Sequence, residues 1–282
     1  MSYQTIMVHL QLGSSNAQVE YSNAAVLHAS RQIAQRCNAA VIGIMAGQQA
    51  QMIYGEGYAL LDFFNREQDY LEEKIAAEEV LFRAAFNGYD KSVEWRSVIT
   101  MDRVLDFIVA QARSADLIIT GVTSSDFYEV PNSAHAGEIV MQSGRPVLAV
   151  PIATKQFKLE NMLIGWKDTR EARRAIADAL PLLKLATQVT VLEIVAKDHK
   201  KESVRRLNEV VNWLKSHNVK AESLAATSND TGAKQFLSIA KKLQADIVIT
   251  GAYGHSRLRE WVLGGVTNEL LQDAHYCSFL SH

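Results

Sequence analysis

Short apolar runs alternate with amphipathic stretches along the whole chain. The apolar runs are rich in β-branched residues and lie at 5–10, 40–46, 161–166 and 189–196. Each is too short for a helix and is followed by a stretch with helical periodicity, which is the pattern of buried strands in parallel β–α units. The hydrophobic pattern therefore predicts an α/β fold with mostly parallel sheet, and it argues against a helical bundle or a β-sandwich.

One apolar segment occurs twice in the chain with nearly the same sequence. SADLIITGV begins at Ser114, and QADIVITGA begins at Gln244. Each copy follows a segment with apolar residues at i, i+3, i+4 and i+7, and each is expected to be a buried strand after an amphipathic helix. We interpret the chain as two tandem copies of one α/β domain, at residues 1–152 and 160–282. The length of 282 residues suits two such domains.

Composition excludes several classes of function. The chain has 29 basic and 31 acidic residues, which gives no electrostatic reason to expect a nucleic acid partner. No apolar run is long enough for a membrane helix, and the first residues do not have the pattern of a signal peptide. Cys37 and Cys277 fall in different repeats and suggest no disulfide framework. We expect a soluble protein in a reducing cytoplasm.

The second repeat places glycines where its predicted strand at 246–250 passes into a loop and then a helix. Gly251 ends the strand, Gly254 follows, and Gly264 and Gly265 precede a helix expected to open at Val266. Glycine lets backbone N–H groups approach an oxyanion closely, and a helix start adds unpaired donors and the positive end of its dipole. This arrangement predicts a phosphate site. The same glycines could instead only end a strand and allow a helix to pack closely on the sheet.

A family resemblance favours the phosphate site. The spacing Gly251-x2-Gly254-x9-Gly264, the segment GWKDTREARRAIADALPLL from Gly165 and the tandem arrangement together resemble the universal stress protein family, in its bacterial tandem type. The resemblance implies two doubly wound domains, each a five-stranded, mostly parallel sheet with helices on both faces. It also implies that an adenine nucleotide, ATP or one of its products, with or without magnesium, binds at the carboxyl ends of the strands.

Carried over to this sequence, the resemblance assigns the glycines to the phosphates and ribose. The family pattern continues with a hydroxyl residue after the last glycine, and here Thr267 is the nearest hydroxyl. His255 adds a cationic group to the loop. The family's aspartate after the first strand corresponds to Lys167, with Asp168 beside it, and Trp166 either stacks on a base or fills the pocket. In the first repeat, Ser124 replaces the second glycine and Pro131 removes a donor, so we expect a degenerate copy.

These residues support a cytoplasmic stress-response protein that acts as a nucleotide-binding or signalling module. Hydrolysis of ATP would be slow at most, because no base or water-orienting residue is evident. The alternative is a scaffold that binds no nucleotide and works through protein partners or another small ligand. His275, Cys277 and His282 could suggest zinc, but a fourth ligand is not apparent, and we expect no metal site.

Two further features concern assembly. The resemblance implies that the segments 145–151 and 277–282 pair with each other, which would make an internal pseudo-dimer; a homodimer stays open. The helical stretch at 58–87 is longer than its counterpart at 204–216. It is either an ordinary crossover helix or, with the segment from Gly47, a lid or partner surface.

Overall fold

The computed structural model describes residues 2–12, 17–49, 58–122, 134–151, 154–227, 232–252, 270–271 and 275–282. Strands and helices alternate along these residues. The strands are β1 (Thr5–His9), β2 (Ala40–Gln48), β3 (Val93–Thr100), β4 (Leu117–Val122), β5 (Val147–Pro151), β6 (Asn161–Gly165), β7 (Gln188–Val195), β8 (Ala221–Thr227), β9 (Ile247–Gly251) and β10 (Cys277–Ser281). The helices are α1 (Ala17–Cys37), α2 (Tyr58–Ala85), α3 (Val104–Gln111), α4 (Ala136–Ser143), α5 (Arg170–Leu183), α6 (Lys200–Ser216) and α7 (Gly232–Lys242), with short 3₁₀ turns η1 (Ala112–Ser114) and η2 (Lys197–His199).

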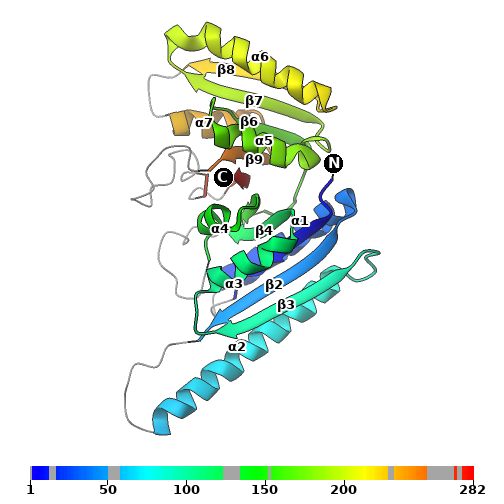
Figure 1. Ribbon diagram of the computed structural model, residues 1–282, viewed down its shortest axis with the longest axis vertical. Helices are drawn as coiled ribbons and strands as arrows, with labels where there is room; N and C mark the ends of the chain where they lie inside the picture. Colours follow the sequence, from blue (N-terminus) through cyan, green and yellow to red (C-terminus); the bar gives the residue numbers. More distant parts are fainter. Residues whose placement is uncertain are drawn as a thin grey trace.

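The strands form one ten-stranded sheet in the order β3-β2-β1-β4-β5-β10-β9-β6-β7-β8 (Figure 1). The first five strands and the last five follow the same order within their halves. All neighbours are parallel except β5 and β10, which pair antiparallel with Leu148 opposite Phe279. The implied pairing of these two segments is therefore present, and it joins the two predicted sheets into one.

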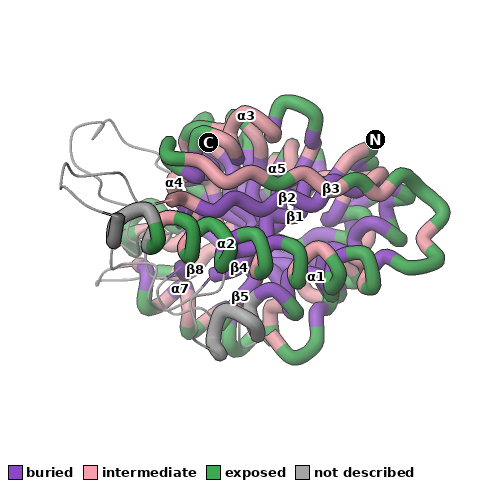
Figure 2. Tube along the Cα trace, turned by 90° about the horizontal axis from the view of Figure 1, so that it is seen from below, coloured by how far each residue is buried: buried purple, intermediate pink, exposed green. Residues whose placement is uncertain are grey.

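Helices cover both faces of the sheet. The largest apolar core lies between the sheet and helices α1, α2, α5 and α6. On the opposite face, one cluster packs under α3 and α4 and another under α7. Figure 2 shows the central strands buried and the outer surfaces of the helices exposed. The predicted α/β fold with mostly parallel sheet and helices on both faces is confirmed.

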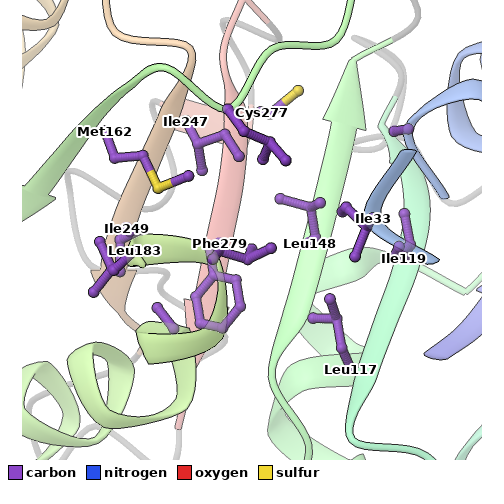
Figure 3. Close-up of a cluster of buried hydrophobic side chains, with 14 of the residues drawn as sticks. Ile33, Leu117, Ile119, Leu148, Met162, Leu183, Ile247, Ile249, Cys277 and Phe279 are labelled. Carbon is purple, nitrogen blue, oxygen red and sulfur yellow. The ribbon is translucent and has the colours of Figure 1, made fainter. Parts of the chain in front are cut away.

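The largest core continues across the β5–β10 junction. Leu148 and Phe279 are both fully buried there, and they lie between apolar side chains of the two halves (Figure 3). A polar contact crosses the junction as well, since the Tyr3 hydroxyl donates to the Asp178 carbonyl at 2.7 Å. Within the second half, the Ser281 hydroxyl donates to the Asp178 carboxylate at 2.6 Å. The two halves therefore share one hydrophobic interior.

The repeated aspartate has a structural role in both halves. Asp116 accepts hydrogen bonds from the backbone N–H groups of Gln4 and Thr5 at 2.7 and 3.0 Å. Asp246 accepts the equivalent bonds from Glu160 and Asn161 at 3.0 and 2.8 Å. Each carboxylate thus ties the start of one strand, β4 or β9, to the start of its neighbour, β1 or β6.

The helix predicted at 58–87 is observed as α2, and its shorter counterpart is observed as α6. Two strands, β3 and β8, are not evident from the hydrophobic pattern. They are the edge strands, and their residues are mostly half-buried or exposed. No helix among the described residues is long and apolar enough to cross a membrane.

Candidate functional site

The carboxyl ends of β6 and β9 form the switch point of the second half. Gly165 pairs with Thr250 at the end of this parallel pair. The chain leaves β6 through α5 on one face of the sheet and returns to β9 through α7 on the other face. Loops that diverge in this way leave a crevice at the carboxyl ends of the two strands, where open α/β sheets bind ligands.

The predicted site residues divide into two groups. Gly251 is the last residue of β9, and Trp166, Lys167 and Asp168 directly follow β6. Because β6 and β9 are neighbours, these four residues come from the same edge of the sheet. The others, Gly254, His255, Gly264, Gly265, Val266 and Thr267, lie outside the described residues.

Gly251 packs against the start of α5. A Cβ atom built on it would lie 2.6 Å from the Glu171 backbone carbon and 2.8 Å from the Ala172 nitrogen. Neither backbone atom can move without shifting the helix. This close approach requires a glycine at position 251 whether or not a ligand binds beside it.

The indole of Trp166 belongs to the helical layer. Its backbone N–H donates to Leu192 at 2.7 Å and so prolongs the β6–β7 pairing. The residue is 9% exposed and is part of the core under α5 and α6. The ring also borders a cavity of about 390 Å³ between these helices, lined by Trp166, Arg173, Ile176, Glu209, Val210 and Trp213.

The first turn of α5 already has its caps. The Thr169 hydroxyl accepts from the Ala172 N–H at 3.4 Å. The Glu171 carboxylate accepts from its own backbone N–H, and this bond is the main reason that the pKa of Glu171 is lowered. Asp168, which follows Lys167, pairs with Arg173 at 2.6 Å. The backbone N–H groups of Glu171 and Ala172 are therefore already engaged by side chains of this turn.

A buried carboxylate lies near the end of β7 and was not predicted. Glu193 is 5% exposed; it accepts the Ser203 hydroxyl at 2.6 Å and pairs with Arg206 at 3.2 Å. Arg206 also pairs with Glu202 at 2.8 Å. The sequence did contain a signal for it, namely a glutamate within the apolar run VTVLEIVA. A carboxylate in a buried strand is rare unless it is paired, so this residue could have indicated a buried ion pair.

At the equivalent edge of the first half, described side chains bond to one another at the ends of β1 and β4. His9, at the position of Gly165, contacts Thr120 with 2.8 Å between Nδ1 and Oγ1, and burial lowers the pKa of His9 to about 4. Gln11, at the position of Lys167, exchanges two hydrogen bonds with the buried Asn23 and reaches the Gly121 carbonyl at 3.3 Å.

The second half differs at the matching threonine. Thr250 is 6% exposed, and its hydroxyl oxygen has no hydrogen-bond partner among the residues that the structure describes. Gly165 offers no side chain to it, and the ring of Phe236 from α7 occupies the space beside that glycine. Within the described part of the chain, the Thr250 hydroxyl is therefore unsatisfied, whereas the Thr120 hydroxyl of the first switch point contacts His9.

The residues considered for zinc do not form a described cluster. Cys277 is buried in β10, and burial raises the pKa of its thiol to about 12. His282 contacts the Ala252 carbonyl at 3.1 Å through Nδ1. No group of three or more potential ligands occurs among the residues that the structure describes.

Solved structures share this architecture over the full chain. A universal stress protein from Archaeoglobus fulgidus DSM 4304 has a TM-score of 0.70 at 12% identity, and the match covers 98% of this chain and 95% of that one. The chain has the universal stress protein fold. A protein of unknown function from Pseudomonas aeruginosa PAO1 has a TM-score of 0.61 at 14% identity, and the match covers 99% of this chain and 92% of that one. A provisionally described universal stress protein from P. aeruginosa UCBPP-PA14 has a TM-score of 0.60 at 14% identity, and the match covers 99% of this chain and 93% of that one.

These likenesses concern the fold alone, because all three identities are low. No protein-family model and no curated protein matches the sequence. The resemblance to universal stress proteins is thus confirmed as a fold. The domain boundaries and the ligand roles of the predicted site residues stay predictions.

Proposed function

We propose that the protein is a cytoplasmic universal stress protein that binds an adenine nucleotide, ATP or one of its products, at the switch point of its second half. In this proposal residues 1–152 and 160–282 are tandem domains joined as an internal pseudo-dimer. The phosphates contact the glycine-rich segment that continues from Gly251 through Gly265, and Thr267 supplies a hydroxyl. The protein acts as a stress-responsive binding or signalling module.

The position of the glycine-rich segment carries this proposal. Gly251 ends β9 beside the end of β6, where the crossover helices diverge to opposite faces of the sheet. The segment from 251 to 265 therefore begins at the place where this class of sheet binds ligands. The hydroxyl of Thr250, which has no partner within the described ranges, supports it, because buried polar groups in folded proteins usually have a partner.

The contrast between the halves supports the second half as the binding half. The first switch point is occupied by the His9–Thr120 contact and by the bonds between Gln11 and Asn23. In addition, Ser124 and Pro131 interrupt the glycine pattern after β4. A ligand there would have to displace satisfied, buried hydrogen bonds, which is costly.

Hydrolysis of ATP would be slow at most. Glu193 is the buried carboxylate of β7, and it is engaged by Ser203 and Arg206, so it is not available as a base in this arrangement. Positioned phosphates without a group that orients the attacking water supply only part of phosphoryl-transfer catalysis.

A thermal-shift titration tests the proposal. A ligand at 100 times its Kd adds about 2.7 kcal/mol to the stability of the folded protein, and we expect ATP, ADP or AMP to raise the Tm by a few degrees. Gly254→Val should abolish the shift, because the new side chain would occupy the phosphate position. Ser124→Val, at the corresponding place in the first half, is the matched control and should leave the shift intact.

A scaffold without nucleotide is the competing function. Two observations favour it: Gly251 is already required by its packing on α5, and the first turn of α5 is already capped. If no adenine nucleotide shifts the Tm of the wild-type protein, or if Gly254→Val and Ser124→Val behave alike, the nucleotide proposal is wrong and the scaffold is favoured.

A further inference from the structure

The edge strand β3 has a free side. It pairs in parallel with β2, and the bonds Val41 N–H to Ser92 O at 2.9 Å and Gln49 N–H to Thr100 O at 2.8 Å fix which residues face β2. In a parallel ladder these positions alternate. Even-numbered residues of β3 therefore bond to β2, and the N–H and C=O groups of Val93, Trp95, Ser97 and Ile99 face outward. No strand pairs with this side in the part of the chain that the structure describes.

The side chains of β3 project to two different environments. Trp95 lies on the α2 face, where its ring contacts Phe82 with centroids 5.2 Å apart. Glu94 and Arg96 lie on the opposite face, since Arg96 also donates to Gln111 of α3 at 2.9 Å. Figure 1 shows β3 as the last strand at this end of the sheet, with α2 packed along it. The charged side chains of β3 itself thus lie on the α3 face, whereas Glu72 and Glu79 of α2 lie beside the strand on the other face.

Those two charges are opposite and adjacent on one face. Arg96 holds Glu94 through two hydrogen bonds, of 3.0 and 2.8 Å, and both side chains are partly exposed. Natural edge strands often carry a charge that repels a second strand. When two copies of one strand pair about a two-fold axis, a single charge on the axis meets a like charge and is repelled. An acid and a base two residues apart behave differently, because in an antiparallel pair each acid can lie opposite the base of the other copy.

The register that matches the charges also matches the backbone. In an antiparallel pair of two β3 strands with the two-fold axis at Trp95, Glu94 lies opposite Arg96 of the partner subunit, and the reverse pair forms on the other side of the axis. Val93, Trp95 and Ser97 then occupy the hydrogen-bonded positions, as their outward N–H and C=O groups require. The charged pairs fall at the non-hydrogen-bonded positions, where cross-strand side chains are closest.

The other edge of the sheet does not have this property. By strand register, Glu222 and Leu224 of β8 correspond to Glu94 and Arg96 of β3. Self-pairing of β8 in the equivalent register would place each glutamate opposite a leucine. Pairing of β3 with β8 would be heterologous, and a heterologous contact builds a ring or an open filament instead of a two-fold dimer. Of these three pairings, only self-pairing of β3 places opposite charges together, matches the outward N–H and C=O groups and closes as a two-fold dimer.

We propose that β3 is a homodimerisation edge, which pairs antiparallel with β3 of a second copy about a two-fold axis at Trp95. The partner is a second copy of this chain, and the resulting sheet continues through both molecules. This surface is distinct from the proposed nucleotide site, so either proposal can fail without the other.

Proline substitutions test the edge. We expect the wild-type protein to sediment with twice the 31.3 kDa mass of one chain. Ser97→Pro removes an outward N–H without affecting a β2 bond, so it should give a folded monomer. Ala225→Pro makes the same change at the corresponding position of β8 and should leave the dimer intact. A wild-type monomer at every concentration tested, or a Ser97→Pro protein that stays dimeric, would overturn the proposal.

Charge exchange tests the register. Glu94→Arg alone places like charges opposite each other, and so does Arg96→Glu alone. Each variant should dissociate with a Kd at least about tenfold higher than wild type. Mixed in equal amounts, the two variants are complementary again and should form a heterodimer. Loss of dimer in the mixture as well would show that the pairing does not use this register.

Discussion

At the scale of single residues, the same glycine can serve packing and binding. Gly251 was predicted from its spacing to contact a phosphate, and the structure shows that its missing Cβ also allows β9 to approach α5. The sequence could not reveal this contact, because α5 begins about eighty residues earlier in the chain. A glycine pattern therefore predicts a close approach without identifying what approaches.

Gly251→Ala tests the packing role. The added Cβ would lie within 2.8 Å of the Ala172 nitrogen, so the start of α5 must shift, and we expect a loss of about 1–3 kcal/mol in the free energy of unfolding. Gly232→Ala is the control, since the nearest side-chain atom there would be 3.7 Å away. Urea denaturation of both variants measures the difference. Equal stability of the two would contradict a packing role for Gly251.

Trp166 shows a second limit at this scale. The apolar run at 161–166 placed Trp166 at the end of the strand, and a side chain there can turn toward either layer of helices. The indole joins the core under α5 and α6, and its counterpart in the first half, Leu10, belongs to the same extended apolar cluster. The direction of a side chain depends on which helices are neighbours, and the local sequence does not contain that information.

At the scale of elements, strands in the sheet centre were predictable and edge strands were not. β4 and β9 are buried, apolar and repeated, so both the hydrophobic pattern and the internal repeat identify them. β3 and β8 are edge strands that are only partly buried, and they carry polar residues such as Glu94 and Glu222. The helix α2 was predicted nearly to its observed bounds because its periodicity extends over many turns.

The contact between β1 and β4 should make stability depend on pH. Burial lowers the pKa of His9 to about 4 in the folded protein, against about 6.5 in the unfolded chain. Between these values the unfolded state binds more protons, so the His9 contribution is complete above pH 6.5 and is lost as the pH falls toward 4. The loss amounts to about 3 kcal/mol.

His9→Gln isolates this contribution, because glutamine can still contact Thr120 but does not titrate. The free energy of unfolding, measured by urea denaturation from pH 7 to pH 4.5, should fall more steeply for wild type than for the variant. Parallel profiles for the two proteins would mean that His9 does not remain neutral in the folded protein.

At the scale of the whole molecule, the two halves share a core instead of merely touching. The β5–β10 ladder places Leu148 opposite Phe279, and the largest apolar cluster includes both residues together with side chains of α1 and α5. A sequence repeat predicts two similar units, yet it does not state whether they unfold separately. The continuous core predicts that they unfold together.

Two matched truncations test this cooperativity. Leu148→Ala and Phe279→Ala each remove a fully buried side chain, one from each half, and should lower the free energy of unfolding by about 2–5 kcal/mol. Because both cavities lie in the shared core, each variant should shift one common transition, seen alike in hydrogen exchange of β1 and of β6. Independent halves would give a different result: Leu148→Ala would weaken protection in β1 alone, and Phe279→Ala in β6 alone. In that case the ladder would join two separately stable domains, and the shared interior would contribute little to the stability of either.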